Sequence, residues 1–246
     1  MDHFLDRYEF GSPIGAGAYG RVFSARRKLD DMPVAIKRVQ FRSRSDWVGG
    51  FPFEIYVLRE LFDVPGVVKM LDHFVGDHHY YVVMEHASPD LYDVMTVYKY
   101  LGEDLCKRLF RDVLRTVIAC KDRGFVHNDI KLENVAMDPA DRKLKLLDFG
   151  LAEFYKPGYT STFRGTVEFA PPEWTEFKVH EAESSAVWTL GVLLYEISQG
   201  PFPADSSRPS FDVPISAEMR DFLESCLRRH NRPKLTDLLE HGWLKD

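Results

Sequence analysis

The pattern of apolar residues changes once along this chain of 246 residues, and the change limits the folds open to it. In the first third, β-rich runs alternate with turn residues, at 8–14, 21–25, 34–39, 67–74 and 80–85. One predicted helix interrupts them at 53–62, where Ile55, Leu58 and Phe62 recur at three- and four-residue spacing. We therefore expect a small, mostly antiparallel sheet interrupted by one helix.

After Ser88-Pro89 the pattern becomes helical. Residues 103–123 carry apolar side chains along one face and end at Gly124, a plausible C-terminal cap. Further helices are predicted at 184–198, 216–227 and 235–239. The chain is thus expected to be a single α+β domain, with a small β-rich lobe at 1–87 that includes a hinge near 85–89, and a larger, mostly helical lobe at 88–246.

Composition restricts the partners. A formal net charge of -6, with both signs mixed along the chain, argues against a general nucleic-acid binder and favours a basic partner. The apolar runs are far shorter than the roughly 20 residues that cross a bilayer, and the N-terminus lacks the features of a secretory signal. Three widely spaced cysteines without a CxxC motif fit reduced thiols, so we expect a cytoplasmic or nuclear monomer.

A glycine-rich motif follows the first predicted strand. Residues 15–20 read Gly-Ala-Gly-Ala-Tyr-Gly, the spacing of loops that cover phosphates. A dinucleotide-binding loop would open a helix, whereas residues 21–25 are predicted to form a returning strand. The motif therefore favours a strand-turn-strand flap over a nucleotide, with Gly15, Gly17 and Gly20 near its phosphates.

One lysine lies in an apolar strand, within Val34-Ala35-Ile36-Lys37. Its ammonium group would be costly there without an anion, so Lys37 is a candidate phosphate ligand. Glu54, on the predicted helix, is a candidate ion-pair partner that would orient Lys37. Taken singly, each residue could equally be a solvated charge.

The densest group of polar residues lies in His127-Asn128-Asp129-Ile130-Lys131-Leu132-Glu133-Asn134, followed by Asp148-Phe149-Gly150. Phosphoryl transfer needs a carboxylate near the incoming hydroxyl, oxygen ligands for Mg²⁺ and positive charge on the moving group. Asp129 can be the carboxylate, Asn134 and Asp148 the metal ligands and Lys131 the positive charge. The ordered set predicts ATP and Mg²⁺ as cofactors.

With these motifs in place, the chain resembles the eukaryotic protein kinase superfamily from Tyr8 to Leu244. Phe169-Ala170-Pro171-Pro172-Glu173-Trp174 and Ser185-Ala186-Val187-Trp188-Thr189-Leu190-Gly191 look most like the Pim family of serine/threonine kinases. Lys131, two residues after Asp129, is also typical of the serine/threonine type. The resemblance implies the bilobal kinase fold and transfer of the γ-phosphate of ATP to protein serine or threonine hydroxyls.

The family pattern also implies the nucleotide contacts. It makes Met84 the gatekeeper and 85–87 the adenine-contacting hinge, through Glu85 and Ala87. The residues that would sandwich the adenine are Ile14, Val22, Ala35 and Ala136. An ion pair between Glu173 and Arg232 is implied for the helical lobe.

The chain departs from the family pattern at several positions. His-Arg-Asp reads His127-Asn128-Asp129, so the arginine that normally receives an activation-loop phosphate is absent, and activity is expected not to depend on such a phosphate. Ala186 stands where many kinases have an aspartate that anchors the catalytic loop, and the chain resembles the Pim family in this departure. Ala136 leaves a roomier pocket floor, and residues 200–214 are shorter than usual and are expected to lack a full helix.

The resemblance also implies substrate-binding residues among three carboxylates, Asp90, Asp93 and Glu133, because matching positions in similar kinases meet basic residues upstream of the phosphorylated hydroxyl. Thr166 completes this expected set. An alternative interpretation makes Asp90 a helix cap and Asp93 a solvated residue of the first turn.

Two functions fit the sequence. An active kinase is favoured because every group that the transition state needs is present. A pseudokinase or nucleotide-sensing scaffold is the alternative, suggested by Asn128, Ala186 and the short 200–214 segment.

Overall fold

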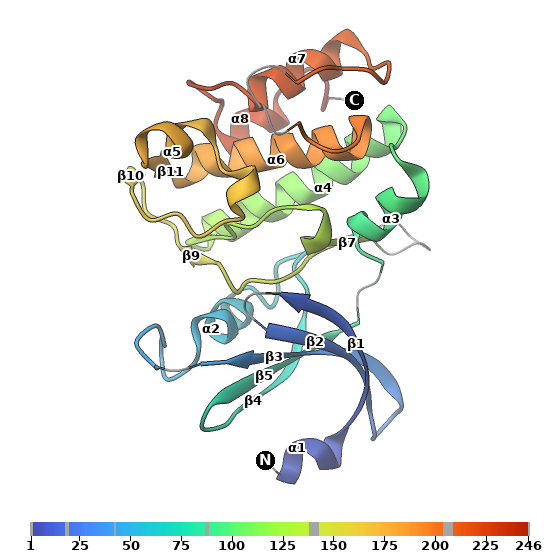
Figure 1. The fold of residues 1–246 in the computed structure, drawn as a ribbon, viewed down its shortest axis with the longest axis vertical. Helices are drawn as coiled ribbons and strands as arrows, with labels where there is room; N and C mark the ends of the chain where they lie inside the picture. Colours follow the sequence, from blue (N-terminus) through green and yellow to red (C-terminus); the bar gives the residue numbers. More distant parts are fainter. Residues whose placement is uncertain are drawn as a thin grey trace. The chain divides into compact units, whose positions relative to one another are not determined.

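A five-stranded antiparallel sheet forms most of the first part of the chain (Figure 1). The computed structural model describes residues 2–17, 20–41, 43–86, 89–137, 143–203 and 209–245. The chain divides into two compact units, of which unit 1 comprises Met1–Asp63 and Val67–Ser88, and unit 2 comprises Val64–Gly66 and Pro89–Asp246.

Unit 1 begins with helix α1 (Asp2–Arg7), and helix α2 (Phe53–Glu60) lies between its third and fourth strands. The strands follow the spatial order β1-β2-β3-β5-β4. Their bounds are β1 (Tyr8–Gly17), β2 (Gly20–Arg27), β3 (Met32–Gln40), β4 (Met70–Val75) and β5 (His79–Glu85). Because β2 returns antiparallel to β1, a strand and not a helix follows the glycine motif, which excludes the dinucleotide-binding interpretation.

Strand register divides the sheet into two faces. Neighbours two apart on a strand share a face, and so do residues directly opposite each other. Val34 and Ile36 of β3 lie with Tyr81 and Val83 of β5 in a buried cluster that Phe4 of α1 completes. The other face carries Ala35, Lys37 and Val39, which pair with Met84, Val82 and Tyr80.

Unit 2 is mostly helical (Figure 1). Its helices are α3 (Leu91–Tyr98), α4 (Glu103–Asp122), α5 (Pro172–Phe177), α6 (Ala182–Gln199), α7 (Ala217–Cys226) and α8 (Leu235–Leu239). Helix α6 is buried along most of its length and packs against α4 and α7. Phe110 of α4 and Phe222 of α7 meet edge to face at 5.2 Å between ring centroids, which places the core of the unit between these helices.

Short elements carry the segments between the helices. The 3-10 helices are η1 (Leu132–Asn134) and η2 (Val167–Phe169). The strands are β6 (Phe125–Val126), β7 (Val135–Met137), β8 (Leu144–Leu146), β9 (Glu153–Phe154), β10 (Tyr159–Thr160) and β11 (His180–Glu181). They pair as β6 with β9, β7 with β8 and β10 with β11.

Local sequence explains where α4 ends and where α7 begins. Gly124 follows α4 with φ +86°, a left-handed conformation that glycine adopts without steric cost, so the expected cap is confirmed. Ser216 caps α7 by accepting a hydrogen bond from the Met219 N–H at 3.0 Å.

Within the described residues, no helix is long and apolar enough to cross a membrane.

The observed elements differ from the predicted ones in a few places. Helices α1 and α5 were not predicted, because six residues are too few to show a helical repeat. The predicted strand at 67–74 begins only at Met70, since Val67 and Val68 are buried without joining the sheet. Residues 200–203 and 209–214 contain no helix, as expected, while 204–208 lie outside the described residues.

The ion pair implied for the helical unit is present. The Arg232 guanidinium donates to both Glu173 carboxylate oxygens at 2.8 Å, and its side chain is only 1% exposed. It also donates to the Ser184 hydroxyl at 2.9 Å and stacks over the Trp188 ring. These contacts fix α5 against α6 and the segment before α8.

Removing the Glu173 carboxylate should therefore destabilise unit 2. We expect Glu173→Ala to lower the free energy of unfolding by about 3 kcal/mol, because it leaves a buried guanidinium unpaired. Glu176→Ala is the matched control, since Glu176 pairs with Arg229 on the exposed surface and should cost less than about 1 kcal/mol. Urea denaturation measures both, and equal losses would contradict a special role for the buried pair.

Candidate active site

Lys37 is the buried centre of the polar group in unit 1. It lies on β3, opposite Val22 of β2, and its side chain is 4% exposed. Its Nζ donates to Glu54 Oε1 at 2.6 Å, and Glu54 is itself buried on α2. The predicted partner of Lys37 is therefore the observed one, and the pair satisfies two charges that would be costly to bury separately.

Val22 and Ala35, which are expected to enclose an adenine, and Met84, the expected gatekeeper, share the face of the sheet that carries Lys37. Register places Val22 opposite Gly15 and Lys37, and Ala35 opposite Met84. Ile14 lies half-exposed on β1, and Gly17 ends that strand opposite Gly20. Glu85 ends β5 and accepts a hydrogen bond from the Lys69 N–H at 2.9 Å, whereas Ala87 lies outside the described residues.

Gly20 has a structural reason to be glycine. A Cβ atom built there would lie 2.5 Å from the carbonyl oxygen of Arg38, closer than any side chain can approach. The close packing of β2 on β3 therefore requires glycine at this position whether or not a nucleotide binds.

In unit 2, His127 fixes the start of the catalytic loop, residues 127–134. Its Nε2 lies 2.7 Å from the Leu147 carbonyl oxygen, and its Nδ1 accepts a hydrogen bond from the Asp129 N–H at 3.2 Å. Because a carbonyl oxygen can only accept, Nε2 carries a proton; because Nδ1 accepts a hydrogen bond, it carries none, and the ring is neutral. The ring also meets Phe149 edge to face at 4.7 Å, which joins the catalytic loop to residues 148–150.

The Asp129 carboxylate is the point at which the predicted catalytic residues of unit 2 meet. Its Oδ1 accepts hydrogen bonds from the Thr166 hydroxyl at 2.5 Å and the Thr166 N–H at 3.3 Å. Its Oδ2 accepts from Asn134 Nδ2 at 2.8 Å and lies 3.2 Å from Lys131 Nζ. Lys131 Nζ also donates to the Thr166 hydroxyl at 2.9 Å, which closes a ring of polar contacts.

Asn134 and Asp148 lie on adjacent backbone segments. The N–H of Leu147, the neighbour of Asp148, donates to the Asn134 carbonyl at 2.8 Å. Asn134 Nδ2 donates to both the carbonyl and the carboxylate of Asp129, so the amide oxygen is the atom that can bind a cation. Asp148 adopts φ +53°, and its Oδ1 accepts a hydrogen bond from the Gly150 N–H.

Asn128, which stands in the position of the usual arginine, contacts a carboxylate of the protein itself. Its Nδ2 donates to Glu153 Oε2 at 3.0 Å and to the Leu151 carbonyl at 3.1 Å. Arg164 Nε lies 3.1 Å from Glu153 Oε1. The three side chains, called the Glu153 clasp below, join the catalytic loop to β9 and to the segment before Thr166.

The expected substrate-binding acids lie close enough to interact. Burial raises the pKa of Asp90, and the negative charges of Asp93 and Glu133 raise it further, against a lowering hydrogen bond from the Asp93 N–H. That hydrogen bond, at 2.8 Å to Asp90 Oδ1, shows that Asp90 caps α3. Asp93 and Glu133 are exposed.

A fourth acid belongs to this group and was not predicted. Burial raises the pKa of Glu196, on α6, to about 7, and the charge of Glu133 raises it in the same direction. Within the described part of the chain, its Oε2 is buried without a hydrogen-bond partner. Sequence offered no signal, because Glu196 lies in a continuous apolar run.

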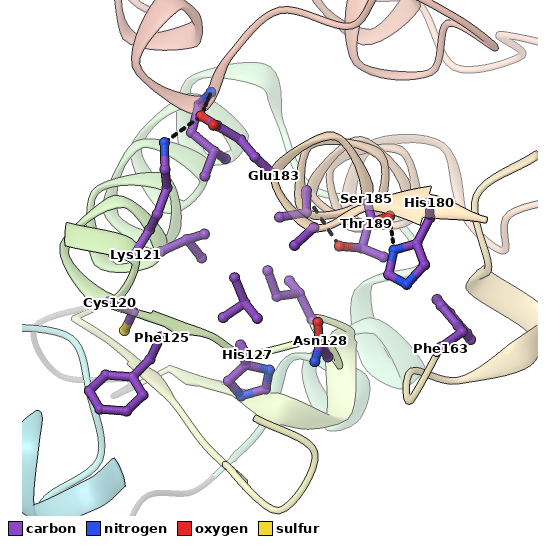
Figure 2. A pocket seen from close by; sticks show the side chains of 16 residues that line it. Cys120, Lys121, Phe125, His127, Asn128, Phe163, His180, Glu183, Ser185 and Thr189 are labelled. Carbon is purple, nitrogen blue, oxygen red and sulfur yellow. Dashed lines mark hydrogen bonds and ion pairs between the residues drawn. The ribbon is translucent and has the colours of Figure 1, made fainter. Parts of the chain in front are cut away.

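A small cavity lies behind the catalytic loop (Figure 2). It is bordered by α4, α6 and His180, and Ala186 forms part of its wall. Asn128 and Ile130 line it, whereas Asp129, the residue between them, does not. Its volume of about 20 Å³ is close to that of one water molecule, so it is too small to hold a nucleotide.

Comparison with known proteins decides the family. The model of the protein kinase domain matches residues 8–244. The chain belongs to the protein kinase family. The expected bilobal α+β kinase fold is thereby confirmed, and the chain is an ATP-dependent enzyme of this family.

Several curated relatives align with all or nearly all of this chain, which spans between about half and nearly nine-tenths of their own length. Serine/threonine-protein kinase pim-2 of Danio rerio is 34% identical over 100% of this chain and 87% of the relative. Serine/threonine-protein kinase prk-2 of Caenorhabditis elegans is 32% identical over 98% of the chain and 59% of the relative. Sperm motility kinase 2B of Mus musculus is 29% identical over 100% of the chain and 53% of the relative. The similarity to Pim kinases and to kinases of the serine/threonine type is confirmed.

Proposed function

We propose that this kinase transfers the γ-phosphoryl group of Mg-ATP to serine or threonine hydroxyls of proteins that carry basic residues upstream of the target. The observation that carries the proposal is the Asp129 carboxylate, held on both oxygens by Thr166, Asn134 and Lys131. A scaffold that only senses nucleotides has no need of such a fixed carboxylate.

Asp129 would act on the incoming hydroxyl. As the hydroxyl oxygen bonds to the γ-phosphorus, the bond to the bridging oxygen of ADP breaks and the hydroxyl proton passes to the Asp129 carboxylate. The Lys131 ammonium, 3.2 Å from Asp129, would stabilise the negative charge on the moving group.

Asn134 and Asp148 would hold Mg²⁺. Both offer oxygen atoms, the ligand type that this cation prefers. The hydrogen bond from the Leu147 N–H to the Asn134 carbonyl keeps Asn134 and Asp148 on adjacent segments. Bound Mg²⁺ would neutralise charge on the nucleotide phosphates.

The nucleotide contacts of unit 1 would come from one face of its sheet. Lys37, oriented by Glu54, would bind phosphate oxygens under the glycine motif. The adenine would lie against Ile14, Val22, Ala35 and Met84, with Glu85 and Ala87 as hinge residues and Ala136 of β7 contributing from unit 2.

We further propose one kinase domain over 1–246 that works as a monomer in the cytoplasm or nucleus, without nucleic-acid or membrane partners. The three buried, free cysteines are compatible with a reducing compartment.

Catalysis should depend on the two aspartates. With Mg-ATP and a generic basic protein, we expect Asp129→Asn and Asp148→Asn to lower the rate by about 10²- to 10⁴-fold, since each removes a group needed in the transition state. Phosphate transfer to serine or threonine is followed with radiolabelled ATP. Asp104→Asn, an exposed acid in the first turn of α4, is the control. Inactive wild-type protein that still binds Mg-ATP would support the scaffold alternative.

Activity should not need a phosphate on the activation loop. In the Glu153 clasp, Asn128 stands in the position of the usual arginine and donates to the Glu153 carboxylate, which also pairs with Arg164. Backbone pairing of Thr160 with His180, and the hydrogen bond from His180 Nε2 to the Thr162 carbonyl at 2.9 Å, hold the same segment.

We expect phosphatase-treated protein to retain most of its activity, and alanine at Thr160, Ser161 or Thr162 to change the rate less than about twofold. Mass spectrometry verifies that the treated protein carries no phosphate. Loss of activity on treatment, with recovery after rephosphorylation of one of these residues, would show that another basic group binds a phosphate.

Basic substrates are favoured by the interacting acids Asp90, Asp93, Glu133 and Glu196. Burial is the main cause of the raised pKa values of Asp90 and Glu196, and the charge of Glu133 adds to both; a guanidinium or ammonium group that binds near Glu133 would offset that added repulsion. Glu133 has the central place, since its charge acts on both of these groups. Asp90 is a poor residue to mutate, because its side chain caps α3.

A peptide library should therefore select arginine or lysine upstream of the target. We expect Asp93→Lys or Glu133→Lys to raise KM for a basic peptide by about tenfold or more, the size of one charge-assisted contact, with KM for ATP unchanged. Asp104→Lys is the matched control, an exposed first-turn acid of another helix. A library without upstream preference, or equal effects of all three reversals, would refute this substrate class.

A further inference from the structure

A second side chain holds the Glu54 carboxylate inside unit 1. Tyr80, on β5, donates its hydroxyl to Glu54 Oε2 at 3.0 Å, while Lys37 donates to Oε1 at 2.6 Å. All three side chains are buried. Each oxygen of the carboxylate therefore has its own donor, one on β3 and one on β5.

Strand register explains how Tyr80 reaches this position. Tyr80 lies opposite Val39, two residues beyond Lys37 on β3, so its side chain shares the face of the sheet that carries Lys37. Its ring also lies 6.4 Å from that of Phe41, which meets Trp47 at 5.2 Å in the segment between β3 and α2. The tyrosine thus connects the sheet, the segment that leads into α2, and a carboxylate on α2 itself.

We propose that Tyr80 is a positioning residue for phosphoryl transfer, which holds Glu54, and through it Lys37 and α2, in the geometry that binds nucleotide phosphates. One donor fixes the distance of a carboxylate but leaves it free to rotate, whereas donors on both oxygens also fix its plane. The inference rests on the proposed role of Lys37 as a phosphate ligand.

Tyr80→Phe tests the proposal by removing one oxygen atom, and the neighbouring Tyr81→Phe is the matched control. Tyr81 is as buried as Tyr80 but lies on the opposite face, where its ring packs 4.7 Å from that of Phe4. We expect Tyr80→Phe to lower kcat/KM for ATP by about tenfold and to weaken Mg-ADP binding several-fold in calorimetry. Tyr81→Phe should leave both within about twofold.

A double variant separates positioning from general packing. In a Glu54→Gln background, Tyr80→Phe should cause little further loss, because the ionised carboxylate that it positions is gone. Equal effects of Tyr80→Phe and Tyr81→Phe, or a full further loss in the Glu54→Gln background, would each overturn the proposal. If wild-type protein binds Mg-ADP but transfers no phosphate, the proposed function fails while the binding comparison still tests Tyr80.

Discussion

The Asp129 carboxylate is the constraint that brings the loop segments of unit 2 together. Lys131 and Asn134 of the catalytic loop contact it, as does Thr166, which lies 37 residues further along the chain. The Asp129 N–H also donates to His127 of the same loop. None of these segments is a long helix or a wide sheet. The large hydrophobic core of α4, α6 and α7 gives them a rigid base, and the buried ion pair of Glu173 with Arg232 fixes the return of the chain behind Thr166.

Unit 1 solves a similar problem with fewer residues. A lysine in an apolar strand needs an anion, and the sheet supplies one through Glu54, whose second oxygen is satisfied by Tyr80. The two faces of the sheet have different tasks. The aromatic cluster around Phe4 stabilises one face, which leaves the other available for the charged pair and the residues expected to contact adenine.

Much of this was predictable from the sequence, for reasons that differ from residue to residue. The five strands and the helices α4, α6, α7 and α8 have long or well-punctuated patterns, and their bounds were predicted to within a few residues. Lys37, Glu54, Asp129, Lys131 and Asn134 were identified because the chemistry of phosphoryl transfer demands such groups in that order, whereas Thr166 was expected only as a substrate-binding residue. The structure brings these residues together within each unit. Their roles in catalysis remain proposals.

The residues that sequence reasoning missed act through tertiary contacts. Tyr80 looks like an ordinary strand aromatic, Glu196 lies in a buried apolar run, and Glu153 with Arg164 carries no motif. Nothing in the local pattern shows that these side chains reach polar partners far along the chain. The cap made by Asp90 was considered as an alternative, and the structure shows that cap.

The Glu153 clasp also restricts how this kinase could evolve. Arginine at position 128 would place a guanidinium next to a carboxylate that is already part of the protein, so an incoming phosphate would compete with a permanent internal anion. A phosphate-operated switch at this position would therefore require the loss of Glu153 as well, and Arg164 would then be left without its present partner. Such a switch could arise in this chain only through linked substitutions.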